Sequence, residues 1–293
     1  MTHPLVSVVI PAYNNDAYIR RTIESVLSQT YPTLEVIIAD HASSDRTLEE
    51  VSNFANDERV TVLTTPSGGG ALRNWNRVSS EAKGDYIKLV CGDDLLRPDI
   101  VAAQVAGLEE NPSAVLAASR RSIVDAQDKT VINARGLAGL TGVVEGKQAV
   151  RRTVRAGTNI FGEPACVMMR RSVLEEVGLW DSRFPYLIDE ATYVRVLLTG
   201  DLFAIGEPMA SFRVSDSQWS VRLLREQSDQ AVAFHEWLGR EYPDVLSPRD
   251  IRHGNSGARR TARLRRLAYW TLGRRMSARA EIGERQSKAG SRR

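Results

Sequence analysis

Short apolar runs alternate with helix-period segments over the first 110 residues, and this alternation limits the possible folds more than any other feature of the chain. The predicted strands are residues 6–10, 34–39, 60–64, the run that starts at Tyr86, and 114–118. Strands that alternate with helices form βαβ units with right-handed crossovers, and such units build parallel sheets. The sequence therefore predicts an α/β fold, with helices on both faces of a mostly parallel sheet.

Beyond residue 120 the periodicity is weaker, and the expected elements are shorter. A hairpin followed by a helix over 146–155 is predicted between about residues 125 and 155. Further strands are expected at 165–169, 202–205 and 209–214, and further helices at 172–177, 189–198 and 218–242. After Pro248 the chain is polar and arginine-rich, with one amphipathic helix predicted over 262–276.

Composition places the chain among ordinary globular proteins and indicates a reducing compartment. It is 42% hydrophobic and 26% charged, and it has no apolar run near the roughly 20 residues that a membrane span needs. Its two cysteines, Cys91 and Cys166, form neither a disulfide framework nor a metal cluster. With no signal-peptide pattern at the N-terminus, the expected location is the cytoplasm.

The net charge of +3 combines an acidic body with a basic tail. Residues 252–293 hold 13 Lys and Arg against two acidic residues, a net charge of +11, which leaves −8 for residues 1–251. Apolar and aromatic side chains lie among the arginines of this tail at Leu264, Leu267, Tyr269, Trp270 and Leu272. The pattern fits a helix on an anionic inner-leaflet surface or a helix packed on the body. Nucleic acid is not an expected partner, because no nucleic-acid-binding motif accompanies the arginines.

Carboxylates recur where predicted strands end. Asp40 follows the second strand, the Asp93–Asp94 pair follows the strand from Tyr86, and Asp189–Glu190 lies later in the chain. The carboxyl ends of parallel strands open on one edge of a sheet, so these carboxylates can converge there. Oxygen ligands of this kind suit Mg²⁺ or Mn²⁺ held together with a phosphate. The alternative is that they cap helices or turns.

The ordered motifs carry a family resemblance. They lie at residues 6–14, 25–32, 39–45, 74–77, 82–87 and 92–94, with thinner matches at 162–164, 177–181, 189–195 and 212–214. In these motifs the chain resembles the family 2 glycosyltransferases, inverting enzymes of the glycosyltransferase-A fold that use nucleotide sugars. The resemblance implies a transferase domain over residues 1–220, with a nucleotide-binding half to about 120 and an acceptor half after it. Residues 221–293 are then a helical, arginine-rich extension with a disordered end.

The same resemblance implies a role for each matched residue. Those that would bind the nucleotide are Pro11, Ala12, Tyr13, Asn14, Asp40, Asn76 and Asp94. For Asp94 the expected contact is with ribose, and the alternative is that it braces the site. Asp93 would hold Mn²⁺ or Mg²⁺, and Asp189 would be the general base, with Glu190 as its rival. Separately, contacts to a glycan or lipid-linked glycan acceptor are expected from Glu163, Trp180 and Trp219. These residues lie in the half where such enzymes vary, and aromatic faces are common platforms for sugar rings.

Three positions depart from the family pattern. Cys91 stands where a further aspartate usually precedes the metal ligand, Ser215 where many members have a histidine, and His41 where a second acidic residue is common. Each change removes a potential anion or metal ligand, so a non-catalytic nucleotide-sugar-binding member is an alternative.

Two other nucleotide-binding classes fit the sequence less well. A sugar nucleotidyltransferase needs a phosphate loop rich in glycine and arginine after the first strand, and residues 11–15 contain neither. A dinucleotide-dependent dehydrogenase needs spaced glycines after that strand, whereas Gly68–Gly70 follow the third strand consecutively.

Overall fold

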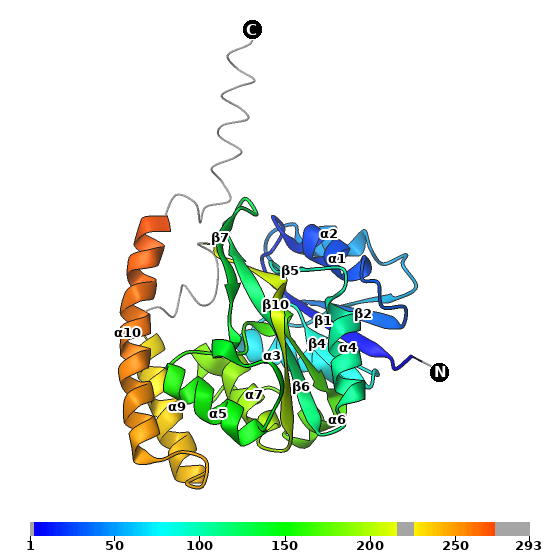
Figure 1. Ribbon diagram of the computed structural model, residues 1–293. Coiled ribbons are helices and arrows are strands. Elements are labelled where there is room, and N and C mark those ends of the chain that lie inside the picture. The colour runs from blue at the N-terminus through cyan, green and yellow to red at the C-terminus, as the bar shows by residue number, and fades with distance from the viewer. Residues whose placement is uncertain (1–2, 216–225, 273–293) are drawn as a thin grey trace.

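The computed structural model describes residues 3–215 and 226–272, and within them one mixed sheet forms the centre of the molecule (Figure 1). The strands are β1 (Val6–Ala12), β2 (Leu34–Asp40), β3 (Val60–Thr64), β4 (Tyr86–Leu89), β5 (Leu95–Leu96), β6 (Ala114–Val124), β7 (Thr130–Arg135), β8 (Gly142–Val144), β9 (Val167–Arg170) and β10 (Asp201–Arg213). Their order is β3-β2-β1-β4-β9-β6-β10-β5, with β7 beside β6 and β8 beside β10.

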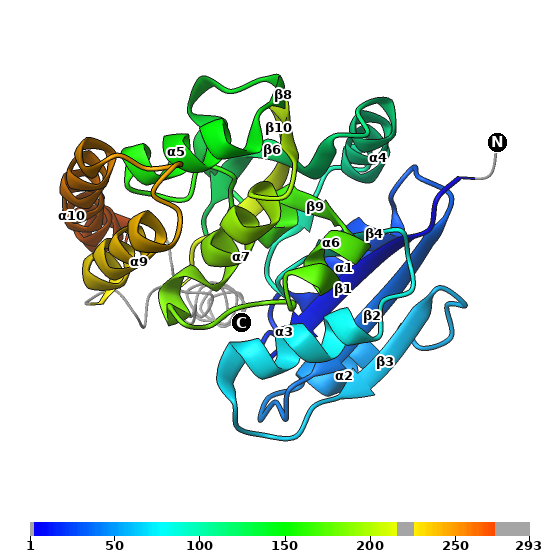
Figure 2. The same cartoon turned by 90° about the horizontal axis from the view of Figure 1, so that it is seen from below.

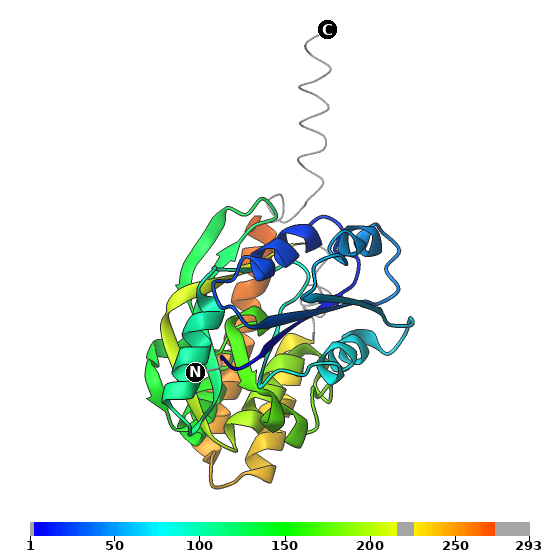
Figure 3. The same cartoon turned by 90° about the vertical axis from the view of Figure 1, so that its right-hand side faces the viewer.

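Helices flank this sheet. They are α1 (Ile19–Leu27), α2 (Thr47–Ser52), α3 (Gly70–Ser80), α4 (Ile100–Glu110), α5 (Gly146–Ala156), α6 (Arg171–Glu176), α7 (Ile188–Leu197), α9 (Gln227–Glu241) and α10 (Pro248–Leu272). Short 3₁₀ turns lie at Leu137–Gly139, Pro164–Cys166 and Pro185–Leu187. Helices α1 and α2 lie on one face of β1 to β3 and α3 on the other (Figure 3).

The predicted α/β fold class is confirmed, and the parallel pairing holds in the first half of the sheet. Strands β3, β2, β1 and β4 are all parallel. Beyond them β9 runs antiparallel to both β4 and β6, and β10 runs parallel to β6. All seven residues of β1 are buried, because the strand is central and helices cover both of its faces.

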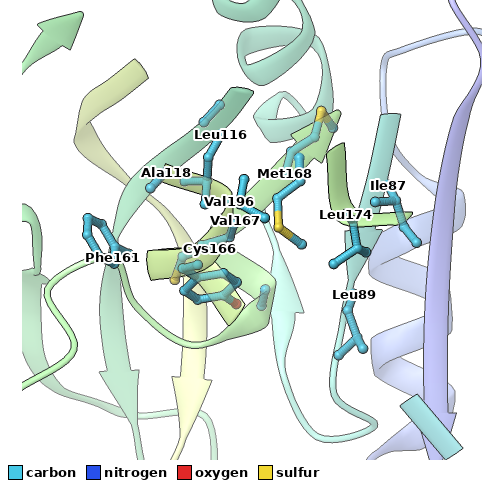
Figure 4. Packing of buried hydrophobic residues seen from close by; sticks show 14 of the residues in the cluster. Ile87, Leu89, Leu116, Ala118, Phe161, Cys166, Val167, Met168, Leu174 and Val196 are labelled. Carbon is cyan, nitrogen blue, oxygen red and sulfur yellow. The ribbon is translucent and has the colours of Figure 1, made fainter. Parts of the chain in front are cut away.

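The core continues across the junction between the two halves of the sheet. Figure 4 shows side chains from β4, β6, β9, α6 and α7 packed together there. The labelled members are Ile87, Leu89, Leu116, Ala118, Phe161, Cys166, Val167, Met168, Leu174 and Val196. Cys166 is 1% exposed among them and packs as a small buried hydrophobe. This packing makes the two halves of the sheet one continuous support for the residues at its edge.

One strand prediction is corrected. The segments 202–205 and 209–214 are not two strands but one, β10, which pairs with β6 along its length. The register shifts on either side of Pro208. Proline has no N–H for the ladder, so a bulge forms there and the strand resumes.

The C-terminal helices also differ from expectation. Helix α9 begins at Gln227, within the predicted 218–242, and residues 216–225 lie outside the described structure. Helix α10 begins at Pro248, earlier than the predicted 262. Its first half packs on α5, where a Cβ on Gly254 would lie 2.3 Å from the Val154 carbonyl oxygen. Small residues let these helices approach closely, and their glycines weaken the helical signal in the sequence. The expected disordered end also lies outside the described residues.

No helix in the described part of the chain has both the length and the apolar character that a membrane span requires.

Candidate active site

A cavity of about 540 Å³ lies beside the carboxyl edge of the parallel strands. Four carboxylates far apart in the sequence line it, namely Asp93, Glu163, Asp189 and Glu190. Their convergence follows from topology, because β4 ends just before Asp93 and α7 carries Asp189 and Glu190 to the same edge. The wall is completed by α3 on one side and by α9 and α10 on the other.

The loop after β1 presents an aromatic ring and an amide to this cavity. Tyr13 is 50% exposed, and its ring centroid lies 6.0 Å from that of His41. Asn14 has φ = 50°, a left-handed conformation that asparagine tolerates, and its Oδ1 accepts a hydrogen bond from the Ser44 N–H at 2.9 Å. This bond fixes the loop at Asn14. The neighbouring Tyr13 ring is half exposed, so it can stack on a planar ligand.

Pro11, Tyr13 and Asn14 line the cavity, whereas Ala12 is fully buried behind it. The Ala12 carbonyl accepts hydrogen bonds from the His41 N–H at 2.9 Å and from the Asn74 side chain at 3.3 Å. Ala12 therefore supports the loop from behind the cavity wall.

Asp40 is also set back from the cavity. It is 2% exposed, and its Oδ2 accepts a hydrogen bond from the Ser43 N–H at 3.1 Å. Asp40 therefore caps the turn that follows β2, as in the alternative given for the strand-end carboxylates. Within the described residues its buried Oδ1 has no hydrogen-bond partner. The contact of Asp40 with a nucleotide remains a prediction.

The predicted Asn76 does not line the cavity, whereas Asn74 on the same helix does. The Asn76 Oδ1 accepts a hydrogen bond from the Trp180 N–H at 3.1 Å, so the side chain joins α3 to the segment after α6. Asn74 donates to the carbonyl of Ala39, at the end of β2, at 2.9 Å and accepts from the Thr65 hydroxyl at 2.7 Å. Its amide thus ties the ends of β1, β2 and β3 together, a role that sequence alone did not identify.

The two aspartates after β4 point in different directions. Asp93 lines the cavity, whereas Asp94 is fully buried and accepts a hydrogen bond from the Arg213 N–H at 3.2 Å. Burial, and then the charge of Asp93, raise the pKa of Asp94 well above its ordinary value. Of the two predicted roles for Asp94, contact with ribose or bracing of the site, the geometry favours bracing.

Arg213 fixes the turn that carries both aspartates, and sequence reasoning did not identify it as a site residue. Its side chain is fully buried, and its Nε donates to the carbonyl oxygen of Asp93 at 2.9 Å. The guanidinium donates to the Asp125 carbonyl at 3.1 Å, forms an ion pair with Asp128, and lies 4.4 Å from the centre of the Tyr18 ring. Through Arg213, strand β10 and the β6–β7 turn therefore hold the backbone of Asp93 in position.

Asp189 lies in the first turn of α7, with a carboxylate held from both oxygens. Its Oδ2 accepts a hydrogen bond from Asn159 Nδ2 at 2.9 Å, and its Oδ1 from the Glu190 N–H at 2.7 Å. Leu187 occupies the cap position, so Asp189 is not the N-cap of the helix. Burial, opposed in part by the Glu190 N–H bond, and the nearby charge of Glu163 raise the pKa of Asp189 to about 7. A carboxylate with this pKa suits proton transfer near neutral pH.

Glu190, the rival base, also lines the cavity but is more enclosed. It is 2% exposed, and its Oε1 accepts a hydrogen bond from the Thr153 hydroxyl at 2.8 Å. Burial raises its pKa to about 8. This bond directs the carboxylate toward α5, which favours Asp189 as the group that meets a substrate.

The predicted acceptor residues separate into three cases. Glu163 lines the cavity and forms an ion pair with Arg121, whose side chain is almost completely buried. Trp180 is 3% exposed, its Nε1 donates to Ser79 Oγ at 2.8 Å, and its ring packs against Trp75. It is a core residue whose faces are covered, so it is withdrawn as a sugar platform. Trp219 lies outside the described residues.

A divalent cation fits this site only together with a phosphate ligand. Within residues 3–215 and 226–272, no three His, Cys, Asp or Glu side chains are grouped as a ligand set. Asp93 reaches the cavity, while the neighbouring Cys91 offers sulfur, a poor ligand for a hard cation. Mg²⁺ and similar ions are commonly bound by one or two carboxylates plus substrate phosphates. The residues present therefore fit a cation that arrives with a diphosphate.

The structure has the glycosyltransferase-A fold, as its likeness to two solved structures shows. The crystal structure of Staphylococcus aureus TarS 1–349 superposes with a TM-score of 0.65 at 16% identity, over 87% of this chain and 70% of that one. A mannosyltransferase from Pyrobaculum calidifontis, in complex with GDP-Man and Mn²⁺, gives a TM-score of 0.63 at 18% identity, over 92% and 76% of the two chains.

The family model described as glycosyl transferase family 2 matches residues 7–178, so the chain belongs to that family. An uncharacterized glycosyltransferase of Haemophilus influenzae is 27% identical over 78% of this chain and 71% of its own length. The chondroitin synthase of Pasteurella multocida is 46% identical over 33% of this chain. The matched part spans about a tenth of that synthase and of the hyaluronan synthase from the same organism.

Proposed function

We propose that the protein transfers a sugar, with inversion, from a nucleotide diphosphate sugar to a hydroxyl of a glycan or glycolipid. The observation that carries this proposal is the presence of Asp93 and Asp189 in the wall of one cavity, beside the exposed ring of Tyr13. Structures of TarS with UDP and with UDP-GlcNAc, and of the mannosyltransferase with GDP-Man, support a nucleotide-sugar donor. In this proposal residues 1–220 form the transferase domain, with the nucleotide bound by its first half.

Each residue of the proposed site has its own role in the sugar transfer. Asp189 accepts the proton of the acceptor hydroxyl while that oxygen forms a bond to the sugar carbon. The bond from this carbon to the diphosphate breaks, and the electron pair leaves with the nucleoside diphosphate. Asp93 would hold Mn²⁺ or Mg²⁺, which when bound offsets the negative charge of the diphosphate. Tyr13 stacks on the base, and Pro11 and Asn14 form the rest of that pocket.

Incubation with UDP-, GDP- and dTDP-sugars in the presence of Mn²⁺ tests this function. We expect nucleoside diphosphate to be released from at least one donor, slowly onto water and faster with a hydroxyl acceptor. Release is measured by a coupled assay for the free nucleoside diphosphate, with a reaction lacking enzyme as the control. Exchange of pyrophosphate would instead indicate a nucleotidyltransferase. Binding of a donor without turnover would indicate the non-catalytic alternative.

We further propose that α10 brings the enzyme to an anionic inner-leaflet membrane surface and a lipid-linked acceptor. Leu264 and Leu267, three residues apart on this helix, are 60% and 57% exposed. Arg263 and Arg266 beside them are also exposed. Apolar side chains between arginines are typical of helices that bind at the surface of anionic membranes. The packing of α10 on α5 and α9 is compatible with this role, because it leaves these four side chains on the outside.

Replacing both Leu264 and Leu267 with glutamate is expected to weaken binding to vesicles of phosphatidylglycerol and phosphatidylcholine at least about ten-fold. Each buried leucine contributes on the order of 1.5–3 kcal/mol, and the added charges are repelled by the anionic lipid. Co-sedimentation measures the bound fraction. Leu48→Glu is the matched control, since Leu48 is 40% exposed on α2, away from α10 (Figure 1). Equal binding by the double variant and wild type would leave body packing as the role of α10.

A further inference from the structure

The glycine-rich segment at residues 67–70 forms part of the cavity wall. It connects the carboxyl end of β3 to α3, and this helix packs against β1 and β2 (Figure 2). Ser67, Gly68 and Gly70 line the cavity. The three glycines, Gly68–Gly70, have φ between 61° and 91°, a backbone conformation that residues with a Cβ rarely adopt. This part of the wall is therefore mostly bare backbone, and contacts specific to one ligand must come from side chains beside it.

His41 is the side chain that joins this segment to the ends of the first two strands. It directly follows β2, and its N–H donates to the carbonyl of Ala12 at the end of β1 at 2.9 Å. Its ring Nε2 lies 2.9 Å from the carbonyl oxygen of Gly68. Because a carbonyl oxygen can only accept, Nε2 carries the hydrogen of this bond. In the neutral imidazole the other nitrogen, Nδ1, is then a hydrogen-bond acceptor.

Nδ1 of His41 is available to a ligand in the cavity. Among the described residues no group donates a hydrogen bond to this nitrogen. The side chain of His41 lines the cavity although the residue is only 8% exposed. An acceptor in such an enclosed position favours a ligand that donates to it, because a complex that leaves it unbonded loses free energy.

The ring of Tyr13 places this acceptor beside the pocket proposed for the nucleotide base. The two ring centroids are 6.0 Å apart, and the ring planes are inclined by 59°. A base that stacks on the half-exposed Tyr13 ring therefore has the imidazole at its edge and not over its face. Asp40, the predicted contact for the base or ribose, is 2% exposed and is not among the cavity-lining residues.

Nucleotide bases form two classes according to the ring nitrogen on their pairing edge. Uracil and thymine carry a hydrogen on N3, and guanine carries one on N1. In cytosine and adenine the corresponding ring nitrogen has no hydrogen and is itself an acceptor. A fixed acceptor at the edge of the base forms a hydrogen bond with the first class and opposes a lone pair in the second.

From this arrangement we propose that His41 selects the base of the sugar donor, with Nδ1 accepting a hydrogen bond from a ring N–H of uracil, thymine or guanine. The inference rests on the proposed function, because it takes the cavity wall at Tyr13 as the base pocket. It adds the class of base that the donor carries. It also gives a role to the histidine that stands where a second acidic residue is common.

Calorimetric titration in Mn²⁺ tests this selection with UDP, dTDP, GDP, CDP and ADP. For the wild-type full chain we expect UDP, dTDP or GDP to bind most tightly. That nucleotide is then compared with its analogue methylated at the ring N–H, which is N3 of the pyrimidine or N1 of guanine. We expect the methylated analogue to bind roughly ten-fold or more weakly, because it cannot donate to the acceptor and leaves it unbonded.

Two substitutions of His41 separate selection of the base from support of the glycine-rich segment. His41→Ala is expected to bring the affinity ratio of the two nucleotides close to one, because it removes the acceptor and leaves room for the methyl group. His41→Gln should keep part of the ratio, since an amide can donate to the Gly68 carbonyl and also accept from the base. If His41 only supported the segment, His41→Ala would weaken both nucleotides alike and leave the ratio unchanged.

His253→Ala is the matched control, since His253 is exposed on α10, and it should keep the wild-type ratio. Tightest binding of CDP or ADP by wild type, a wild-type ratio near one, absence of nucleotide binding, or an unchanged ratio in His41→Ala would overturn the inference. Release of nucleoside diphosphate from sugar donors is measured separately. If that release fails while the ratio depends on His41, the proposed function falls and the base contact stands. If release occurs and the ratio does not depend on His41, only this inference falls.

Discussion

Asp189→Asn is expected to lower kcat by about 10²–10⁴-fold and to leave the affinity for the donor close to that of wild type. The range is the usual contribution of a positioned general base. Asparagine has nearly the same shape and can still accept the hydrogen bond from the Glu190 N–H, but it cannot take a proton from the acceptor. Steady-state transfer rates and calorimetric donor binding measure the two quantities. Wild-type turnover in this variant would show that Asp189 is not the base.

Glu190→Gln is the control for this assignment, because Glu190 is the rival base one residue along. Its carboxylate is held by the Thr153 hydroxyl, which glutamine can also bind. We expect a much smaller loss of turnover than in Asp189→Asn, and thermal unfolding checks that both variants fold. The reverse order of effects would assign the base to Glu190.

The pH profile gives this prediction a second readout. Asp189 accepts a proton only when it is ionised, and its raised pKa is about 7. We therefore expect kcat/KM to rise with pH up to about 7 and then level off, and this acid limb to be absent from any residual activity of Asp189→Asn. Glu163→Gln removes a negative charge that raises the pKa of Asp189, so in that variant the limb should move to lower pH.

The elements that sequence predicted best are those whose signals are local. Strand β3 spans Val60–Thr64, as predicted, because it is a β-branched run between polar turns. The start of helix α10 was predicted 14 residues too late, since it depends on close contact between Gly254 and α5. A contact between residues about 100 positions apart leaves no periodic signal in either segment.

In the candidate site, too, the residues in local motifs were predicted, and the roles that depend on contacts far apart in the sequence were missed. Of the carboxylates that strand-end topology predicted to converge, Asp93, Asp189 and Glu190 line one cavity. Asp40 and Asp94 do not, because both are buried behind its wall.

Arg213 was not identified, because its value to the site comes from a bond to the Asp93 carbonyl, 120 residues away. Trp180 was predicted to contact the acceptor because aromatic faces are common platforms for sugar rings. Its burial against Trp75 depends on packing that sequence does not show.

Asp93→Ala is expected to abolish the dependence of nucleotide binding on metal, with a loss of affinity in Mn²⁺ of at least about 100-fold. Among the described residues Asp93 supplies the carboxylate that follows β4 in the cavity wall, and neither Cys91 nor Ser215 can replace a hard anionic ligand. The loss should exceed the 10–100-fold seen when only a supporting partner of a metal ligand is removed.

The fold should survive this substitution, because Arg213 holds residue 93 through its backbone carbonyl, which alanine retains. Calorimetric titration of the nucleoside diphosphate released in the donor panel, with Mn²⁺ and with EDTA, measures the effect. Wild type should bind more tightly with Mn²⁺, and Asp93→Ala should bind equally weakly in both conditions. Asp99→Ala is the matched control, since Asp99 forms a surface ion pair with Arg97 and should keep the full response to metal. A variant at position 93 that still gained affinity from Mn²⁺ would show that other groups bind the cation.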